Sequence, residues 1–306
     1  MSTQTYVIGI DLGGTKVEAC LLDAQRNVLS RCRTPSEPAL GLDRVCQNIH
    51  KVVLEVAGGK PFSAVGIGTP GTYLPLQDML FGSPHTPVYE TPGFVSRLRR
   101  EFGVPLAVEN DANCLGIAEY FAQCAGTYRF VMAVILGTGL GCGLVLDGKL
   151  YRGALGGAGE IGHCTIDYQG RLCECGRRGC AEAYLSGSSL SRRYAELCGQ
   201  HMEVPQIYQR ALAGDRDAAN LFEESCYFMG EVFANAVNGF DLEAIILGGG
   251  VSNVPCWYGR VPFYLKQSLF GPPRTNIPIL KAVLGDSAGV VGAGYLALRE
   301  LGLLEF

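Results

Sequence analysis

The sequence predicts an α/β protein of two domains, and three observations support this expectation. Short apolar runs that suit buried strands alternate with segments whose apolar residues recur at helical spacing. Three glycine-rich turns each follow a predicted strand. The chain of 306 residues exceeds the size that a single hydrophobic core fills comfortably. Because no low-complexity linker marks a boundary, we expect interleaved domains rather than two successive ones.

The predicted elements follow in order from the N-terminus. The apolar run at 6–10 is expected to be a buried strand, and strands at 16–22 and 27–33 follow it. Gly13 and Gly14 would join the first two. Apolar residues at positions 42, 45, 49, 52, 53 and 56 predict a helix. The alternation continues with strands at 64–68, 105–108, 130–136, 142–146 and 244–247, and with helices at 95–102, 112–125, 188–198, 218–238 and 288–301.

Composition and charge exclude several classes of function. A net charge of −4, with no run of Lys or Arg, leaves no electrostatic footprint for nucleic acid. No stretch of about 18 consecutive apolar residues occurs, so we expect no membrane span. The first residues lack the pattern of a signal peptide. The 13 cysteines, an odd number, then indicate reduced thiols in a cytoplasmic protein.

The segment 160–182 has the composition of a metal site. Its candidate ligands are His163, Cys173, Cys175 and Cys180, with the spacing H-x9-C-x-C-x4-C. One imidazole and three thiolates fill a tetrahedral zinc site completely, so such a zinc would be structural. Glu160 and Glu182, just outside the ligands, would be the functional groups that it holds. The C-x-C step is tighter than usual, and the alternative is a chance cluster of cysteines. A di-iron site is excluded because its Glu-x-x-His motif must occur twice.

The three glycine-rich turns are candidate phosphate sites. Glycine lets the backbone approach a phosphate closely and point consecutive amides at it. None of the turns is a Walker A loop or a G-x-G-x-x-G motif, and each alone is more often a tight turn. Three together favour a nucleotide, for which Asp11 would supply a Mg²⁺ ligand and Thr15 a hydroxyl. The candidate residues are Asp11, Gly13, Gly14, Thr15 and Lys16 in the first turn, Gly137, Thr138 and Gly139 in the second, and Gly249 and Gly250 in the third.

A candidate base follows the predicted strand at 105–108. Asp111 lies beside Asn110 and Asn113. A carboxylate at a strand end can take a proton from an alcohol while neighbouring amides hold the substrate. The alternative is that Asp111 caps the next helix, a common role for Asp at such a turn. The local sequence on its own favours the capping role.

These motifs together resemble those of the ROK family (repressor, open reading frame, kinase) of sugar kinases and regulators. The motifs are Asp11-Leu-Gly-Gly-Thr15, Gly68-Thr-Pro-Gly71, Asn110-Asp-Ala-Asn113, Leu136-Gly-Thr-Gly139, Gly159-Glu-Ile-Gly-His163, the Cys173 to Glu182 segment and Leu247-Gly-Gly-Gly250. The resemblance covers essentially the whole chain. It implies an actin-like ATPase (ribonuclease H-like) fold, with two α/β lobes around a cleft and a zinc-bound loop.

The resemblance also implies which sites belong to each lobe. The N-terminal lobe would comprise 1–112 and 288–306, with the phosphate loop and the catalytic Asp. The C-terminal lobe would comprise 113–287, with the zinc site and the loops on the adenosine side. ATP with Mg²⁺ would bind the glycine turns, and a hexose would lie between the lobes.

Roles for single residues follow from the same resemblance. Asp111 is similar to the base that deprotonates the attacking sugar hydroxyl. The residues similar to sugar ligands are Asn110, Glu160, His163 and Glu182, with the amide of Gly71. The residues similar to the family's zinc ligands are His163, Cys173, Cys175 and Cys180. One imidazole nitrogen of His163 on zinc would leave the other to donate to a sugar oxygen.

One stretch departs from the family pattern. Many family sugar kinases carry an Asn that contacts the sugar after Gly71, whereas this chain has Ser83 or His85 there. We include His85 among the candidate substrate ligands. The segments 249–253 and 284–289 resemble the fructokinase and N-acetylhexosamine kinase branches.

The expected function is therefore transfer of the γ-phosphate of ATP to a hexose hydroxyl, O6 above all. Fructokinase or a related hexokinase is the first expectation, and N-acetylglucosamine/N-acetylmannosamine kinase is the alternative. Family repressors carry a winged-helix module before the first glycine turn, which is not expected here. A non-catalytic sugar sensor would be expected to lose Asp111 or the turn glycines. The expected partners are a hexose, ATP and a second copy of the chain in a homodimer.

Overall fold

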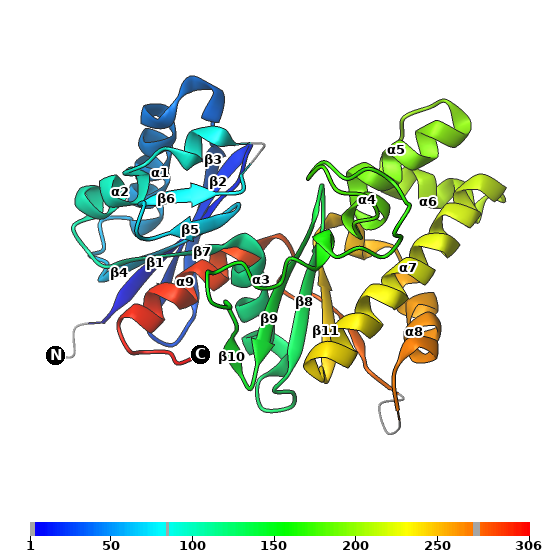
Figure 1. The fold of residues 1–306 in the computed structure, drawn as a ribbon. Helices are drawn as coiled ribbons and strands as arrows, with labels where there is room; N and C mark the ends of the chain where they lie inside the picture. The colour runs from blue at the N-terminus through cyan, green and yellow to red at the C-terminus, as the bar shows by residue number, and fades with distance from the viewer. Residues whose placement is uncertain (1–3, 84–85, 272–275) are drawn as a thin grey trace. The chain divides into compact units, whose positions relative to one another are not determined.

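The computed structural model describes residues 4–83, 86–271 and 276–306, which form two compact units (Figure 1). Unit 1 contains the chain up to Phe121 together with Lys149–Ala158 and Asp286–Phe306. Unit 2 contains Ala122–Gly148 and Gly159–Gly285. Each unit combines a sheet with helices, so the expected α/β class is confirmed.

The sheet of unit 1 has the strand order β3-β2-β1-β4-β7. Its strands are β1 (Tyr6–Leu12), β2 (Lys16–Asp23), β3 (Val28–Pro35), β4 (Ala64–Thr69) and β7 (Leu106–Asn110). β2 is antiparallel to β1 and β3, whereas β1, β4 and β7 are parallel. Asp11 is paired with Gly68, and Gly68 with Glu109. The parallel strands therefore end side by side at one edge of the sheet.

Helices cover both faces of this sheet. The further elements of unit 1 are η1 (Pro38–Leu40), α1 (Leu42–Ala57), the hairpin β5 (Thr72–Leu74) and β6 (Met79–Phe81), η2 (Pro87–Glu90), α2 (Phe94–Phe102), α3 (Asp111–Glu119), β10 (Lys149–Leu150) and α9 (Ala288–Glu300). Successive side chains of a strand point to opposite faces. Ile8 and Ile10 share a core with Ile49 of α1, whereas Gly9 between them faces α9.

Helix α9 packs against the backbone of β1 and β4 because glycine occupies the facing positions. A Cβ at Gly9 would lie 2.2 Å from the carbonyl oxygen of Val290, and one at Gly66 only 1.8 Å from that of Ala293. Glycine is required at both positions because a side chain would not fit there, and not because of the backbone conformation. Close packing of this helix keeps the strand ends in register.

The sheet of unit 2 repeats the pattern of an antiparallel hairpin followed by two parallel strands. β8 (Val131–Leu136) and β9 (Leu140–Leu146) form the hairpin, and β11 (Ala244–Gly248) and β12 (Ile279–Lys281) follow in the order β9-β8-β11-β12. The other elements are η4 (Ile161–His163), α4 (Glu182–Leu185), α5 (Gly187–Cys198), α6 (Val204–Leu212), α7 (Arg216–Phe240), η5 (Gly250–Asn253) and α8 (Cys256–Ser268). Val134, Leu247, Phe233 and Trp257 are fully buried in its core.

The predicted strands and helices are confirmed, apart from shifts at their ends. The helix expected at 112–125 ends at Glu119 and continues as a π-helical turn, Tyr120–Cys124. The hairpin β5–β6, the short strands β10 and β12, and helices α6 and α8 were not predicted. Pro205 at the start of α6 and Pro262 inside α8 look like breaks in a helical pattern. Among the described residues, no helix is long and apolar enough to cross a bilayer.

Gly66→Ala is expected to destabilise the protein, because the added Cβ would enter the backbone of α9. We expect a loss of about 2–4 kcal/mol, measured as a lower midpoint of urea unfolding. Gly259→Ala in α8 is the matched control, since its Cβ would meet no atom within 4 Å. Helix propensity predicts a gain of about 0.5–1 kcal/mol there. Equal stability of the two variants would contradict the packing of α9.

Candidate active site

Four side chains converge in unit 2 where the sequence predicts zinc. They are His163, Cys173, Cys175 and Cys180, and their ligand atoms all lie within 4.8 Å of one another. The Sγ atoms of Cys175 and Cys180 are 3.6 Å apart, and Sγ of Cys173 is 3.7 Å from Nδ1 of His163. Tetrahedral zinc with ordinary bond lengths requires about 3.8 Å between two sulfurs and about 3.6 Å between sulfur and nitrogen. The donors and their spacing therefore fit a zinc ion enclosed entirely by protein ligands.

A tight turn, rather than a helix, places Cys173 and Cys175. The amide of Gly176 donates to the carbonyl oxygen of Cys173 at 2.9 Å, and Gly176 has a φ of 85° that glycine adopts without strain. The amide of Cys173 donates to the carbonyl oxygen of Arg177 at 2.8 Å. This turn brings both thiols of the short C-x-C step to the same site. The spacing that weakened the sequence prediction is thus compatible with metal binding.

The thiols of this cluster differ in acidity. Burial opposes ionisation of Cys175, yet hydrogen bonds from the Arg177 amide and from the neighbouring thiols lower its pKa to about 6. Burial raises the pKa of Cys173 to about 12. Because thiolate is the form that binds metal, Cys175 is the thiol most ready to bind, and Cys173 must release a proton on binding.

The end of the parallel strands in unit 1 brings two carboxylates together. Asp11 lies near the end of β1, and Asp111 opens α3 directly after β7. Burial, and then the charge of Asp111, raise the pKa of Asp11 to about 6, although Lys16 opposes the shift. Gly289 leaves room beside this acid, since a Cβ there would lie 3.2 Å from the Asp11 carboxyl group. Two carboxylates that repel each other favour a bound cation or proton.

Asn110, and not Asp111, is the N-cap residue of α3. Its Oδ1 accepts from the amides of Ala112 at 2.9 Å and Asn113 at 3.4 Å. Its Nδ2 donates to the carbonyl oxygen of Gly71 at 3.2 Å. Asp111 also accepts from the Ala112 amide, at 2.8 Å. The capping role that the sequence offered to Asp111 therefore belongs to its neighbour, and two predicted sugar ligands, Gly71 and Asn110, are in contact.

The sequence did not predict the support behind this turn. Glu109 is buried, and its Oε1 accepts from Nδ2 of Asn113 at 2.9 Å and from the amide of Asn110 at 3.0 Å. Its Oε2 forms an ion pair with Arg152, from the segment Lys149–Ala158. A charged residue at the end of a buried strand is a signal of such a role. Its partner lies 43 positions away and cannot be identified from spacing.

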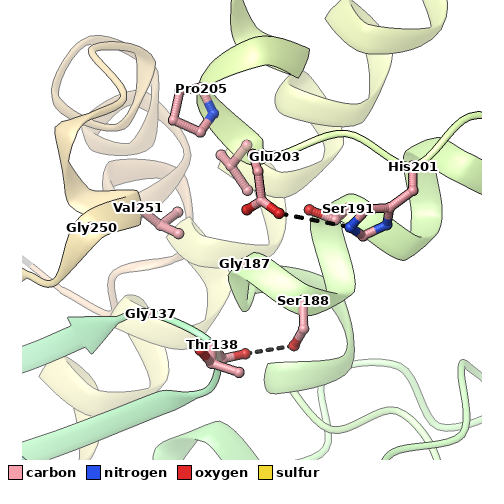
Figure 2. Close-up of a pocket in the computed structure, with 11 residues that line it drawn as sticks. Gly137, Thr138, Gly187, Ser188, Ser191, His201, Glu203, Pro205, Gly250 and Val251 are labelled. Carbon is pink, nitrogen blue, oxygen red and sulfur yellow. Dashed lines mark hydrogen bonds and ion pairs between the residues drawn. The ribbon is translucent and has the colours of Figure 1, made fainter. Parts of the chain in front are cut away.

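The second and third glycine turns meet at a pocket of about 480 Å³ in unit 2 (Figure 2). Gly137, Thr138 and Gly250 line it, as the prediction of a shared nucleotide site requires. Its other lining residues are Gly187, Ser188, Ser191, His201, Glu203, Val204, Pro205 and Val251, from α5, α6, η5 and the segment before α6. The volume is in the range of small-molecule sites.

The remaining predicted residues differ in their surroundings. Gly249 has a φ of 82°, and a Cβ there would lie 2.4 Å from the carbonyl oxygen of Leu136, so this turn requires glycine. Glu160 is exposed. Glu182 is half-buried and accepts from the amide of Leu140 at 2.9 Å. His85 lies outside the described residues.

The first turn is a hairpin that joins β1 to β2. The amide of Gly13 donates to the carbonyl oxygen of Lys16 at 2.9 Å, and the hydroxyl of Tyr89 donates to the carbonyl oxygen of Gly13 at 2.9 Å. Gly14 and Thr15 at its tip are exposed. The turn is thus anchored at its base while its tip is accessible to a ligand.

Residues 7–300 match the sequence profile of the ROK family. The chain belongs to this family. This ROK protein is 32% identical to the N-acetyl-D-glucosamine kinase of Pasteurella multocida (strain Pm70), over 95% of this chain and 99% of that protein.

Two solved ROK structures are similar along nearly their whole length. The ROK hexokinase from Thermus thermophilus has a TM-score of 0.87 at 30% identity, covering 97% of this chain and 99% of that one. The ROK family glucokinase from Streptomyces griseus, in complex with glucose and AMPPNP, has a TM-score of 0.80 at 31% identity, covering 97% and 100%. The family expected from the motifs is confirmed.

The Cys/His cluster predicts one tightly bound zinc per chain of this ROK protein. Cys175→Ser is expected to lose the metal, because a hydroxyl is a poor substitute for a thiolate ligand. Cys164→Ser is the matched control, since this exposed thiol directly follows His163 but is not part of the ligand set. Metal content measured by mass spectrometry checks both. Metal-free wild-type protein that is folded and active would contradict the prediction.

The acidity of Asp11 predicts a pH-dependent effect on stability without Mg²⁺. Its folded-state pKa of about 6 exceeds the unfolded value of 3.8, so the cost of ionising it grows as pH rises from 3.8 to about 6 and is constant above that. Asp11→Asn should therefore stabilise the protein by about 2–3 kcal/mol at pH 8 and hardly at all near pH 4. Thermal unfolding in chelator at both pH values measures this, with the exposed Asp286→Asn as control. A gain that is the same at both pH values would show that charge is not the cause.

Proposed function

We propose that this chain is an ATP-dependent N-acetyl-D-glucosamine kinase that phosphorylates O6 of the sugar. The kinase activity rests on the Asp11–Asp111 pair at the strand ends and on the pocket lined by the two glycine turns of unit 2. The choice of sugar rests on relatives that are 30–32% identical over 95% of the chain and are named N-acetyl-D-glucosamine kinases. These relatives favour the alternative expected from the sequence over fructokinase.

The proposal includes the actin-like (ribonuclease H-like) fold that the resemblance implies. Two features support it. The sheet of unit 1 orders three antiparallel strands before two parallel ones, and the pairing β9-β8-β11-β12 in unit 2 repeats the hairpin and the parallel strands. Glycine turns follow β1 and β8 as hairpins that could bind phosphate, and a third glycine turn follows β11 and leads into η5.

Each unit contains groups of a kind that binds part of ATP. In unit 2, the pocket at Gly137, Thr138 and Gly250 has the size for the nucleoside part and presents backbone groups from two turns. In unit 1, the exposed tip of the first turn would bind phosphate through backbone amides and the hydroxyl of Thr15. Asp11 is the residue that would hold Mg²⁺, which when bound neutralises charge on the phosphates.

Asp111 would act as the general base. Its carboxylate accepts the proton of the sugar hydroxyl as the oxygen bonds to the γ-phosphorus, and the bond to the β-phosphate oxygen breaks to release ADP. Capping of α3 by Asn110 and the buried Glu109–Arg152 pair hold the backbone of this turn. Burial, and then the charge of Asp111, favour a proton on Asp11 while no Mg²⁺ is bound.

The zinc loop would bind the sugar without taking part in phosphoryl transfer. His163 presents Nδ1 toward Cys173, so its Nε2 is the nitrogen that would donate to a sugar oxygen. Glu160 and Glu182, at the ends of the same loop, would accept from sugar hydroxyls. In unit 1, Asn110 and the amide of Gly71 are the groups that would hydrogen-bond to a sugar.

A panel of sugars with ATP tests the proposal by the rate of ADP release. We expect kcat/KM for N-acetyl-D-glucosamine to exceed that for glucose, fructose and N-acetylmannosamine by about tenfold or more. Asp111→Asn should lower kcat by about 10²–10⁴-fold, because the amide cannot accept the proton. Asp217→Asn, an exposed acid in the first turn of α7, is the control. A preference for fructose would restore the first expectation. If none of the sugars in the panel caused ADP release, the proposed kinase activity would be contradicted.

A further inference from the structure

Three residues in the segment that follows Cys180 hold the glycine turn between β8 and β9. We call Glu182, Gly187 and Ser188 the latch. Oε2 of Glu182 accepts from the amide of Leu140 at 2.9 Å. The amide of Gly187 donates to the carbonyl oxygen of Gly137 at 2.7 Å, and Oγ of Ser188 donates to that of Thr138 at 2.5 Å (Figure 2). Every residue from Gly137 to Leu140 except Gly139 is thus bonded to the latch.

Glycine residues allow the latch and the β8–β9 turn to pack closely against each other. A Cβ at Gly187 would lie 2.8 Å from the carbonyl oxygen of Gly137 and 3.0 Å from a methyl group of Val251. A Cβ at Gly139 would lie 2.8 Å from Oε2 of Glu182. Glycine at 187 allows a backbone contact with Gly137 that a side chain would obstruct, and glycine at 139 leaves the Glu182 carboxylate in its place. The glycines of this turn therefore serve the latch as well as a ligand.

The latch is joined to the metal cluster at its other end. Glu182 lies two positions after Cys180, and its Oε1 is 4.0 Å from Sγ of Cys173. The amide of Ala181, between them, donates to the carbonyl oxygen of Cys164 at 3.0 Å. While Cys173 is a thiol, one carboxylate thus accepts from a ligand sulfur with one oxygen and from the turn backbone with the other. A bound metal would remove that proton, and the short backbone from Cys180 to Glu182 would then be the link between the ligands and the turn. If the ligands became disordered, Glu182, which holds the Leu140 amide, would be expected to move with them.

The same turn and latch line the pocket of unit 2. Gly137, Thr138, Gly187 and Ser188 are all lining residues, and Val251 closes the contact with Gly187. A turn that shifts by the length of a hydrogen bond changes the pocket where the donor nucleotide would bind. The sequence assigned Glu182 to sugar binding alone. Its hydrogen bond to the Leu140 amide also connects it to the turn that lines the proposed nucleotide pocket.

We propose that Glu182 and Ser188 are positioning residues for the donor nucleotide, and that the latch couples metal binding at the Cys/His cluster to nucleotide affinity. The inference rests on the proposed function, since it takes the pocket as the nucleotide site. Metal that orders the ligands fixes Glu182 and thereby the turn, so zinc and nucleotide favour each other's binding. The metal would act on the donor as well as on the sugar.

Calorimetric titration with a non-hydrolysable ATP analogue and Mg²⁺, in the absence of sugar, tests the latch in zinc-loaded protein. Ser188→Ala should weaken nucleotide binding about threefold to tenfold, the value of one hydrogen bond, and Ser188→Thr should restore it by returning the hydroxyl. Glu182→Ala should weaken binding similarly, whereas Glu182→Gln retains an acceptor for the Leu140 amide and should bind like the wild type. Because no sugar is present, loss of a sugar contact cannot produce these effects. Ser188→Ala that binds like the wild type would overturn the proposal.

Zinc dependence tests the coupling itself. Protein stripped of zinc by a chelator and returned to Mg²⁺ should bind the analogue about tenfold more weakly than loaded protein. In Glu182→Ala the same treatment should change the affinity for the nucleotide analogue much less, because the hydrogen bond from the Leu140 amide to Glu182 is already lost. Equal zinc dependence in both proteins, or none in the wild type, would contradict the coupling. Wild-type protein that binds no nucleotide at all would instead refute the proposed function, so the two failures are distinguishable.

Discussion

The convergence of one imidazole and three thiols is the interaction on which the site in unit 2 depends. Between Tyr151 and Ala181, the described chain contains one 3-10 turn, Ile161–His163, and isolated bridges such as Thr165 with Cys180. Backbone hydrogen bonds of this kind cannot order a long loop alone, because fixing each residue costs entropy that only packing or ligation repays. A metal at this cluster would supply that free energy. Its charge would also keep Cys173 ionised despite the burial that raises the pKa of this thiol.

Unit 1 depends on a different constraint, the close approach of a helix to a sheet. Gly9 and Gly66 let the backbone of α9 pack on β1 and β4. The parallel strands then end together, so that Asp11 and Asp111 interact although 100 positions separate them. The burial that this packing imposes raises the pKa of Asp11. The same constraint thus provides both the fold of the unit and the chemistry of its carboxylates, and it makes the free protein less stable at high pH.

Much of this arrangement could be predicted from the sequence, and the exceptions have physical reasons. The strands and most helices follow from apolar periodicity, and the ligand set follows from the spacing of His163 and the cysteines. Helices α6 and α8 could not be predicted, because Pro205 and Pro262 interrupt their pattern. The ion pair of Glu109 with Arg152 and the contact of Ser188 with Thr138 join residues far apart in the chain, and no local pattern encodes them. The sequence suggested that Asp111 could cap α3, whereas Asn110 is the residue that caps it. Both residue types cap helices equally well, so the sequence could not distinguish them.

X-ray absorption at the zinc edge of the purified protein tests the central claim, a closed metal site that shapes the loop, most directly. The account predicts three sulfur scatterers at about 2.3 Å and one nitrogen at about 2.0 Å, unchanged when N-acetyl-D-glucosamine is added. A first shell that contains a water oxygen, or that changes when sugar is added, would contradict it. The metal would then have an open position and take part in binding the substrate.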